Sequence, residues 1–284
     1  MASPAITARP IRILREMVTA IEAAIPVTIA DPKPKSVHKL RAATRRIEAQ
    51  LELISLLPNL PEHASPAKKA RRLLKKLRRF AGRVRDLDVQ YKLTQSKSPK
   101  LHQEAHHLRS LFKRQRDDEA ERLLHILHKH QPKLTRALED LLEALAAAEA
   151  LTVPAARLSQ LTVSWYTRNV PVATQNPDQL HAIRKSAKIA RYMAESASPA
   201  AKPGAPTARL ARTFEALQQS GGDWHDWLTL SSIARRELGP SSPLTQSFDS
   251  HRERSLRTYR RHLQSLPENL SLTTIPRKSP GLPG

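Results

Sequence analysis

Three short patterns occur twice in this chain, in the same order and at nearly the same separation. The pairs start at His38 and His181, at Gly82 and Gly222, and at His106 and His251. Their separations lie between 140 and 145 residues. Each match is short by itself, but chance rarely preserves both order and spacing across three of them. The repeat therefore indicates a duplicated unit of about 140 residues, and we expect two similar halves.

Each half is expected to be helical, because apolar residues recur with the period of an α-helix and β-branched residues never alternate over a useful length. Glycine is scarce (7) and proline common (22), which favours long helices that end at prolines. The expected helices cover 10–25, 36–57, 66–92, 101–130, 132–150, 154–169, 177–196, 206–219, 223–238 and 243–265. The fold class is thus predicted to be all-α, with short connections between antiparallel neighbours.

These ranges also predict the organisation of the chain. A flexible N-terminus covers 1–9, a first helical unit covers 10–150, and a second covers 151–266. Residues 267–284 are rich in proline and polar side chains and predict a disordered tail.

The charge is the second constraint. Lys and Arg number 48 against 26 Asp and Glu, a net charge of +22, and both halves share the excess. So basic a chain is expected to bind a polyanion such as nucleic acid, an anionic membrane or a phosphate polymer. Only 4% of the residues are aromatic, which disfavours a platform that stacks unpaired bases.

Other classes are excluded by what the composition lacks. Without cysteine, the chain can form no disulfide, thiol nucleophile or cysteine-ligated metal site, and it fits a reducing cytosol. No apolar run is long enough to span a membrane, and residues 1–10 do not read as a secretory signal.

The repeated helix carries a row of cations on one face. His38, Arg41 and Arg45 follow at positions 0, +3 and +7, within an arc of roughly 80°. The second copy extends the row to +10 with His181, Arg184, Lys188 and Arg191. A single basic stripe is most often a solvated surface. Two matched copies favour a shared anion site instead.

A further helix adds cations. Residues 68–85 contain ten Lys and Arg and no acid, and one face combines Arg71, Lys75, Arg78 and Arg85 with Gly82. Because glycine has no side chain, it would let a ligand or neighbour approach the backbone there. We interpret Asp86 and Asp226 as ion-pair partners of nearby cations rather than as metal ligands. The stripe from His106 to Arg116 is followed by acids, so we expect at most a secondary contact from it.

Three segments resemble the signatures of the CHAD (conserved histidine α-helical domain) family. They read VHKLRAATRR at 37–46, GRVRDLDV at 82–89 and LHAIRKSAKIARY at 180–192. The resemblance spans about residues 10–265, as in a stand-alone member. It implies two four-helix bundles related by a pseudo-twofold axis, with a basic groove between them. It also implies that this groove binds inorganic polyphosphate.

The resemblance, together with the stripe at Lys75, predicts a set of phosphate-binding residues from both halves. They are His38, Arg41, Arg45, Arg46, Lys75, Arg78, Arg79, Arg85, His181, Arg184, Lys188 and Arg191. The chain departs from the family pattern at Glu48 and Ile189, where a basic residue is common, and at His225, which replaces an arginine. The second half is therefore expected to carry less charge.

The sequence predicts binding without catalysis, because it contains neither a phosphate-binding loop motif nor a Glu-x-Glu-x-Lys strand. We expect no cofactor, no metal and no catalytic residue. Two alternatives stay open: a protein that binds or compacts nucleic acid through its backbone, and a polyphosphate-processing enzyme. The expected partner is polyphosphate, with weak nucleic-acid binding, in the cytoplasm and associated with polyphosphate granules. Charged forms of His38 and His181 would make binding weaken between about pH 6 and 8. Oligomeric state is not predicted.

Overall fold

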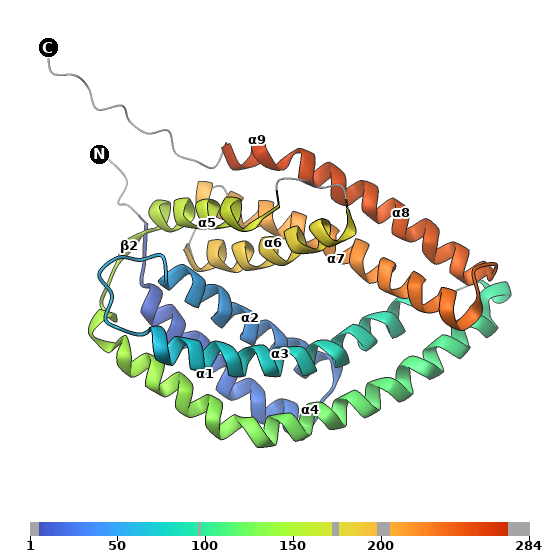
Figure 1. Ribbon diagram of the computed structural model, residues 1–284, viewed down its shortest axis with the longest axis horizontal. Coiled ribbons are helices and arrows are strands. Elements are labelled where there is room, and N and C mark those ends of the chain that lie inside the picture. Colours follow the sequence, from blue (N-terminus) through green and yellow to red (C-terminus); the bar gives the residue numbers. More distant parts are fainter. Residues whose placement is uncertain (1–5, 96–97, 172–175, 198–204, 272–284) are drawn as a thin grey trace, which may run out of the picture.

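The structure is a computed structural model that describes residues 6–95, 98–171, 176–197 and 205–271. The all-α prediction is confirmed, since helices make up nearly all of these residues (Figure 1). The helices are α1 (Pro10–Ala30), α2 (Pro34–Ile54), α3 (Ala64–Leu93), α4 (His102–Ala144), α5 (Ala155–Asn169), α6 (Pro177–Ala197), α7 (Pro206–Leu238), α8 (Pro243–Gln264) and α9 (Leu266–Ser271). Short 3-10 turns lie at Pro99–Leu101 and Ala146–Ala148.

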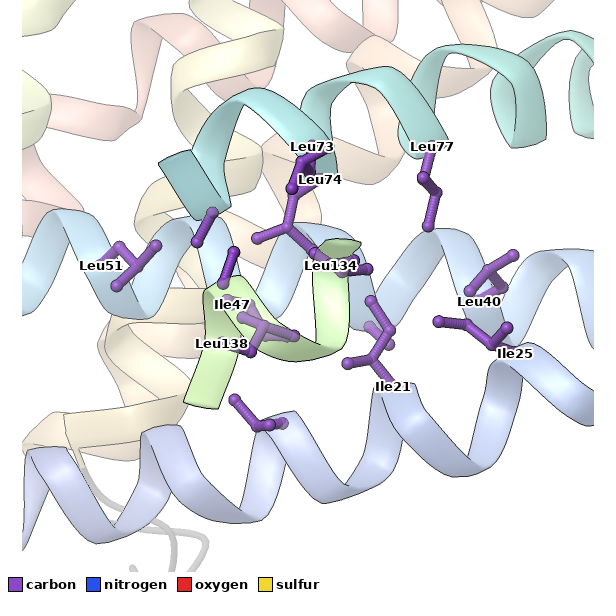
Figure 2. Close-up of a cluster of buried hydrophobic side chains, with 14 of the residues drawn as sticks. Ile21, Ile25, Leu40, Ile47, Leu51, Leu73, Leu74, Leu77, Leu134 and Leu138 are labelled. Carbon is purple, nitrogen blue, oxygen red and sulfur yellow. The ribbon is translucent and has the colours of Figure 1, made fainter. Parts of the chain in front are cut away.

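Helices α1 to α4 pack around one apolar core. In α1 the buried residues include Ile11, Leu14, Val18, Ile21 and Ile25, at the spacing that places them on one face. Leucine and isoleucine side chains from α2, α3 and α4 meet this face, as Figure 2 shows for Ile21, Leu40, Leu74 and Leu134. The apolar residues that recur with helical spacing in the first half are thus buried among α1 to α4.

Helices α5 to α8 surround a second core that α2 also enters. Ala49 and Leu53 of α2 are buried in the same cluster as Ile183 and Ala187 of α6. Helix α2 therefore has two buried sides, one for each core, and it packs directly against α6. This contact places the two His-containing helices side by side, across the boundary between the upper and lower halves of Figure 1.

A third apolar cluster joins the far ends of α3 and α4 to those of α7 and α8. It includes Leu108 and Phe112 of α4, with Leu230 and Phe248 from the other half. Beside it, a carboxylate oxygen of Glu104 accepts hydrogen bonds from the hydroxyl of Ser242 (2.9 Å) and the backbone N–H of Leu244 (3.1 Å). The two halves are therefore held together where α2 packs on α6 and again at the C-terminal ends of α3 and α7.

Two predicted helix breaks are wrong. Residues 102–144 form one helix through Pro132, and Figure 1 shows it as a long curved element. Leu127 and Leu134 are buried in the same core on either side of the proline, so packing keeps the axis continuous despite the missing hydrogen bond. Likewise, α7 runs unbroken through Gly221 and Gly222. Gly221 is buried there, and tertiary packing outweighs the low helix propensity of glycine.

Smaller differences concern the ends of the two units. Thr7–Ala8 (β1) and Val153–Pro154 (β2) pair as a two-residue antiparallel ladder, although the sequence showed no strand. Residues 267–271, where a disordered tail was expected, belong to the short helix α9, whose first residue, Leu266, is buried in the second core. The rest of the expected tail, 272–284, lies outside the described residues.

Candidate anion-binding site

The site is built where α2 and α6 pack together. Arg41 and Arg45 project from α2, and Arg184 and Lys188 project from α6; we call these four residues the basic cluster. Their mutual proximity is visible in their electrostatics, because Arg45, Arg41 and Arg184 all act on the ammonium of Lys188. Burial, and then these three charges, lower the pKa of Lys188 to about 6. At neutral pH the ligand-free protein therefore holds this lysine largely uncharged.

The arginines of the basic cluster lack partners. The Nε atoms of Arg41, Arg45 and Arg184 are buried and donate no hydrogen bond to any of the described residues. No ion pair within 4.0 Å involves these side chains in that part of the chain. Burial, followed by the charges of Arg41 and Arg78, lowers the pKa of Arg45 to about 10. Several half-buried cations without counterions are costly for a folded protein, and a bound anion would remove that cost.

Two arginines of the basic cluster lie beside glycines of α3 and α7. A β-carbon at Gly82 would stand 3.7 Å from Nε of Arg41. At Gly221 it would stand 3.2 Å from Cγ of Arg184 and 2.9 Å from the ring of Tyr259. The sequence repeat pairs Gly82 with Gly222, but Gly222 has no atom within 4 Å of such a β-carbon. The glycine that receives the second arginine is therefore Gly221.

The two predicted histidines occupy similar surroundings. Partial desolvation, then the charges of Arg85, Arg41, Lys188 and Arg46, lower the pKa of His38 below its ordinary value. The pKa of His181 is also lowered, first by partial desolvation and then by the charges of Arg184 and Lys185. Both histidines are therefore mostly neutral near pH 7 in the absence of an anion.

His225 replaces the expected arginine and faces His181. The two rings are tilted at 49° with their centroids 4.8 Å apart. Burial, then the charges of Arg184, His181 and Lys188, lower the pKa of His225 to about 3. His225 therefore adds no charge at neutral pH, as the substitution for arginine led us to expect.

Asp86 and Asp226 face the basic cluster at longer range. The sequence interpretation made each of them an ion-pair partner, but neither has a cation within 4.0 Å among the described residues. Arg184, Asp86 and Lys188 nevertheless act on Asp226, whose pKa is raised to about 6, with burial as the largest cause. The pKa of Asp86 is also raised, mainly because the surrounding protein partly desolvates it. The acids thus neutralise the basic cluster only in part.

The other predicted residues fall into two groups. Arg46 and Arg85 lie close enough to His38 to lower its pKa, so they border the basic cluster. Arg191 instead forms ion pairs with Glu195 (2.7 Å) and Glu215 (2.9 Å), and Arg78 pairs with Glu48. These two arginines already have counterions, which distinguishes them from the basic cluster.

On α3 the two remaining predicted cations point to solvent. Lys75 is exposed between Arg71 and Arg78, and Arg71 pairs with Glu52 at 3.3 Å. Arg79 is exposed, and its guanidinium stacks over the ring of Phe80 at 5.1 Å. No described contact joins Lys75 or Arg79 to the basic cluster.

One neighbour of the basic cluster was not singled out from the sequence. Tyr192 of α6 lies under the guanidinium groups of Arg46 (5.7 Å to the ring centroid) and Arg191 (5.6 Å). Its position, four residues after Lys188, was the available signal, because residues at that spacing share a helix face. Across the described ranges, no group of three or more His, Asp or Glu side chains is placed to hold a metal ion. None of the described helices has the length and apolar character needed to cross a membrane.

Comparison with known proteins places this arrangement in a family. The CHAD domain family matches residues 12–235. A solved structure, the crystal structure of the CHAD domain from the plant Ricinus communis, is 19% identical, with a TM-score of 0.59 over 98% of this chain and 95% of that one. PptA from Streptomyces chartreusis is 14% identical, with a TM-score of 0.57 over 88% of this chain and 96% of that one. No curated protein matches.

The sequence identities are low, so the solved structures establish the shared fold alone. The family match is the stronger finding, because it includes the helices that carry the basic cluster and the glycines beside it. It covers well over half of the residues, and the resemblance noted in the sequence is confirmed. The chain therefore belongs to the CHAD domain family.

Proposed function

We propose that this protein binds inorganic polyphosphate, without catalysis, in a basic groove between its two helical halves. The observation that carries this proposal is the basic cluster: three arginines with buried, unpartnered Nε atoms beside a lysine whose pKa is lowered to about 6. A chain of phosphates would supply each of them with an oxygen acceptor. The ligand would bind along α2 and α6, with Arg46 and Arg85 at the edge of the groove.

The internal repeat supports an elongated ligand over a single small anion. Arg41 lies against Gly82, and Arg184 lies against Gly221, so each half offers an arginine seated on a glycine of the neighbouring helix. We propose that the two halves arose by duplication and that each contributes one side of the groove. The row from His181 to Lys188 alone is about 10 Å long at 1.5 Å per residue, which exceeds the size of one phosphate.

The chemistry of the basic cluster suits phosphate oxygens more than bases. Arginine presents a planar fork of N–H donors to phosphate, and lysine presents a point charge. Among the aromatic side chains beside the basic cluster, Tyr192 has its ring under arginine side chains, and Tyr259 is fully buried. Polyphosphate, which has no bases, needs no aromatic platform.

Competition tests the proposal directly. The intact protein is bound to labelled long-chain polyphosphate at moderate salt, and unlabelled polyphosphate or duplex DNA is added at equal phosphate concentration. We expect polyphosphate to compete much more effectively than DNA. If duplex DNA displaces the label equally well, the protein is a general backbone-binding protein and the proposal is wrong.

The absence of catalysis needs its own measurement. Polyphosphate of defined length is incubated with the protein and Mg²⁺, and the chain-length distribution is compared by gel electrophoresis before and after. We expect an unchanged distribution and no release of orthophosphate. Shortening of the chains that follows the protein concentration would identify a polyphosphate-processing enzyme instead.

A further inference from the structure

A second feature adjoins the basic cluster. A cavity of about 790 Å³ lies between α1, α2 and the C-terminal part of α6. We call it the α1–α2 trough and define it by Met17, Ala20, Ala24 and Val27 of α1, with Ala42 and Ala43 of α2. Its volume is in the range of small-molecule sites, which span about 300–1,000 Å³.

The trough exists because α1 is apolar on two sides. One side, which includes Leu14 and Ile21, is buried in the first core, while Ala20 and Val27 lie on the other. Met17 and Ala24 lie between the two sides, since they pack against the first core and also line the trough. Val27 is 59% exposed, a high value for a large apolar side chain. From Ile13 to Val27 the lining of α1 runs for about 21 Å at 1.5 Å per residue. On α1 the lining is aliphatic apart from Glu16, whereas Ser36, Tyr192 and Ser196 add polar groups on the other sides.

The charges around the trough do not cancel. His38, Lys39 and Arg46 of α2 also line it, and none of them has an ion pair within the described ranges. The acids that line it already have partners: Glu16 pairs with Arg12 at 3.4 Å, and Glu195 pairs with Arg191 at 2.7 Å. The trough therefore combines an aliphatic floor with two cations that lack ion pairs in the described part of the chain, Lys39 and Arg46, and with the mostly neutral His38.

From this combination we propose that the α1–α2 trough binds a phosphate monoester of a long aliphatic alcohol. The aliphatic chain lies on the alanines of α1 and α2, and the phosphate is held by Arg46, His38 and Lys39. The inference rests on the proposed function only in that His38 and Arg46 border both sites. The occupant is a single molecule, because the surface is hollow, whereas a membrane surface is met by a convex or flat apolar face.

Binding of alkyl phosphates of increasing length tests the inference. The intact protein is titrated calorimetrically with butyl, octyl and decyl phosphate below their micelle concentrations. Each buried methylene should tighten binding by roughly threefold to fourfold. Decyltrimethylammonium, which has the same tail and a cationic head, should bind at least tenfold more weakly than decyl phosphate. An affinity that does not change with chain length, or equal binding of the cationic amphiphile, overturns the inference.

Filling the trough provides the matched variant. Ala20→Phe combined with Ala24→Phe places two rings in the cavity and should weaken decyl phosphate by at least tenfold. Ala216→Phe, at an exposed alanine of α7 outside the trough, should leave this affinity unchanged. Circular dichroism and thermal melting establish that each variant folds. Loss of binding in Ala216→Phe, or none in the double variant, contradicts the assignment.

The same proteins separate this inference from the proposed function. Ala20→Phe with Ala24→Phe should bind long-chain polyphosphate as the wild type does, because the trough floor does not contact the basic cluster. If wild-type protein binds polyphosphate but no alkyl phosphate, only the inference fails. If it binds decyl phosphate in the trough but no polyphosphate, the proposed function fails and the inference stands.

Discussion

The Nε atom of Arg41 lies 3.7 Å from the position that a β-carbon on Gly82 would occupy, so the arginine of α2 packs beside this glycine of α3. Arg184 lies in the corresponding place beside Gly221 of α7, where the space is tighter because Tyr259 also borders it. Each half therefore has a glycine beside an arginine of the basic cluster, and the two glycines differ in how much room they leave.

This difference predicts opposite effects of one substitution. Gly82→Ala adds an ordinary van der Waals contact and raises helix propensity, so the free energy of unfolding should rise by about 0.5–1 kcal/mol. Gly221→Ala should lower it by about 1–3 kcal/mol, because the new β-carbon meets the ring of Tyr259 at 2.9 Å. That ring is fully buried, and its hydroxyl donates to the carbonyl of Leu180 at 3.0 Å.

Urea denaturation of the wild type and both variants checks the pair. Equal destabilisation by the two substitutions would show that the packing around Gly221 is no tighter than that around Gly82.

Removing one arginine from each half should weaken polyphosphate binding strongly. Arg41→Ala with Arg184→Ala deletes two charge-assisted contacts, each worth about 1.5–3 kcal/mol, so affinity should fall by at least a hundredfold. The matched control is Arg257→Ala with Arg260→Ala, at two exposed arginines of α8. Fluorescence anisotropy with labelled polyphosphate measures both. Equal losses would mean that affinity follows total charge and not the basic cluster.

The dependence on salt should report the number of phosphate contacts. The logarithm of the affinity should fall linearly with the logarithm of salt concentration, by about 0.7 per contact if polyphosphate resembles single-stranded nucleic acid. The variant Arg41→Ala with Arg184→Ala should therefore have a slope shallower by about 1.4 than the wild type. An unchanged slope would show that neither arginine contacts the polymer.

Binding should also depend on pH through proton uptake. The pKa values of Lys188 and Asp226 are both about 6 in the free protein, and a nearby polyanion raises both. Polyphosphate should therefore bind with net proton uptake, and affinity should fall as pH rises from 6 to 8. The lowered pKa values of His38 and His181 make their contribution smaller than the sequence suggested. Calorimetry at pH 7 in buffers of different ionisation enthalpy measures this uptake; a heat independent of buffer would exclude it.

Lys188 should lower the stability of the free protein and strengthen its binding of polyphosphate. Its pKa is lowered from 10.5 to about 6 by folding, so unfolding takes up a proton between these values and stability rises with pH across that window. Lys188→Met removes the buried ammonium, and the free energy of unfolding at pH 7 should increase by about 1–4 kcal/mol. Polyphosphate affinity should fall in the same variant.

Denaturation at pH 7 and pH 9, with binding at pH 7, tests both halves of this prediction. The difference in stability between Lys188→Met and the wild type should be smaller at pH 9, because less free energy is needed to deprotonate Lys188 at that pH. A variant that is less stable than the wild type at pH 7 would show that the ammonium is stabilised in the free protein.

The sequence alone predicted the helical fold class and the family, because both depend on local information. Apolar spacing gave the helices, and the segments around His38, Gly82 and His181 carried the family resemblance. Local signals failed at Pro132 and at Gly221, where buried neighbours on both sides keep a helix continuous. Propensity acts over a few residues, and it cannot report what packs against them.

The candidate site shows the same division. The stripes on α2 and α6 were evident from residue spacing, as was the lower charge expected beside His225. Only the tertiary structure decided which cations lack partners: Arg191 and Arg78 form ion pairs with acids, whereas Arg41 and Arg184 form none among the described residues. Charge compensation depends on distances between helices, and the pKa of Lys188 depends on burial between them. Sequence thus determined which residues could bind an anion, and packing decided which of them are left without a counterion.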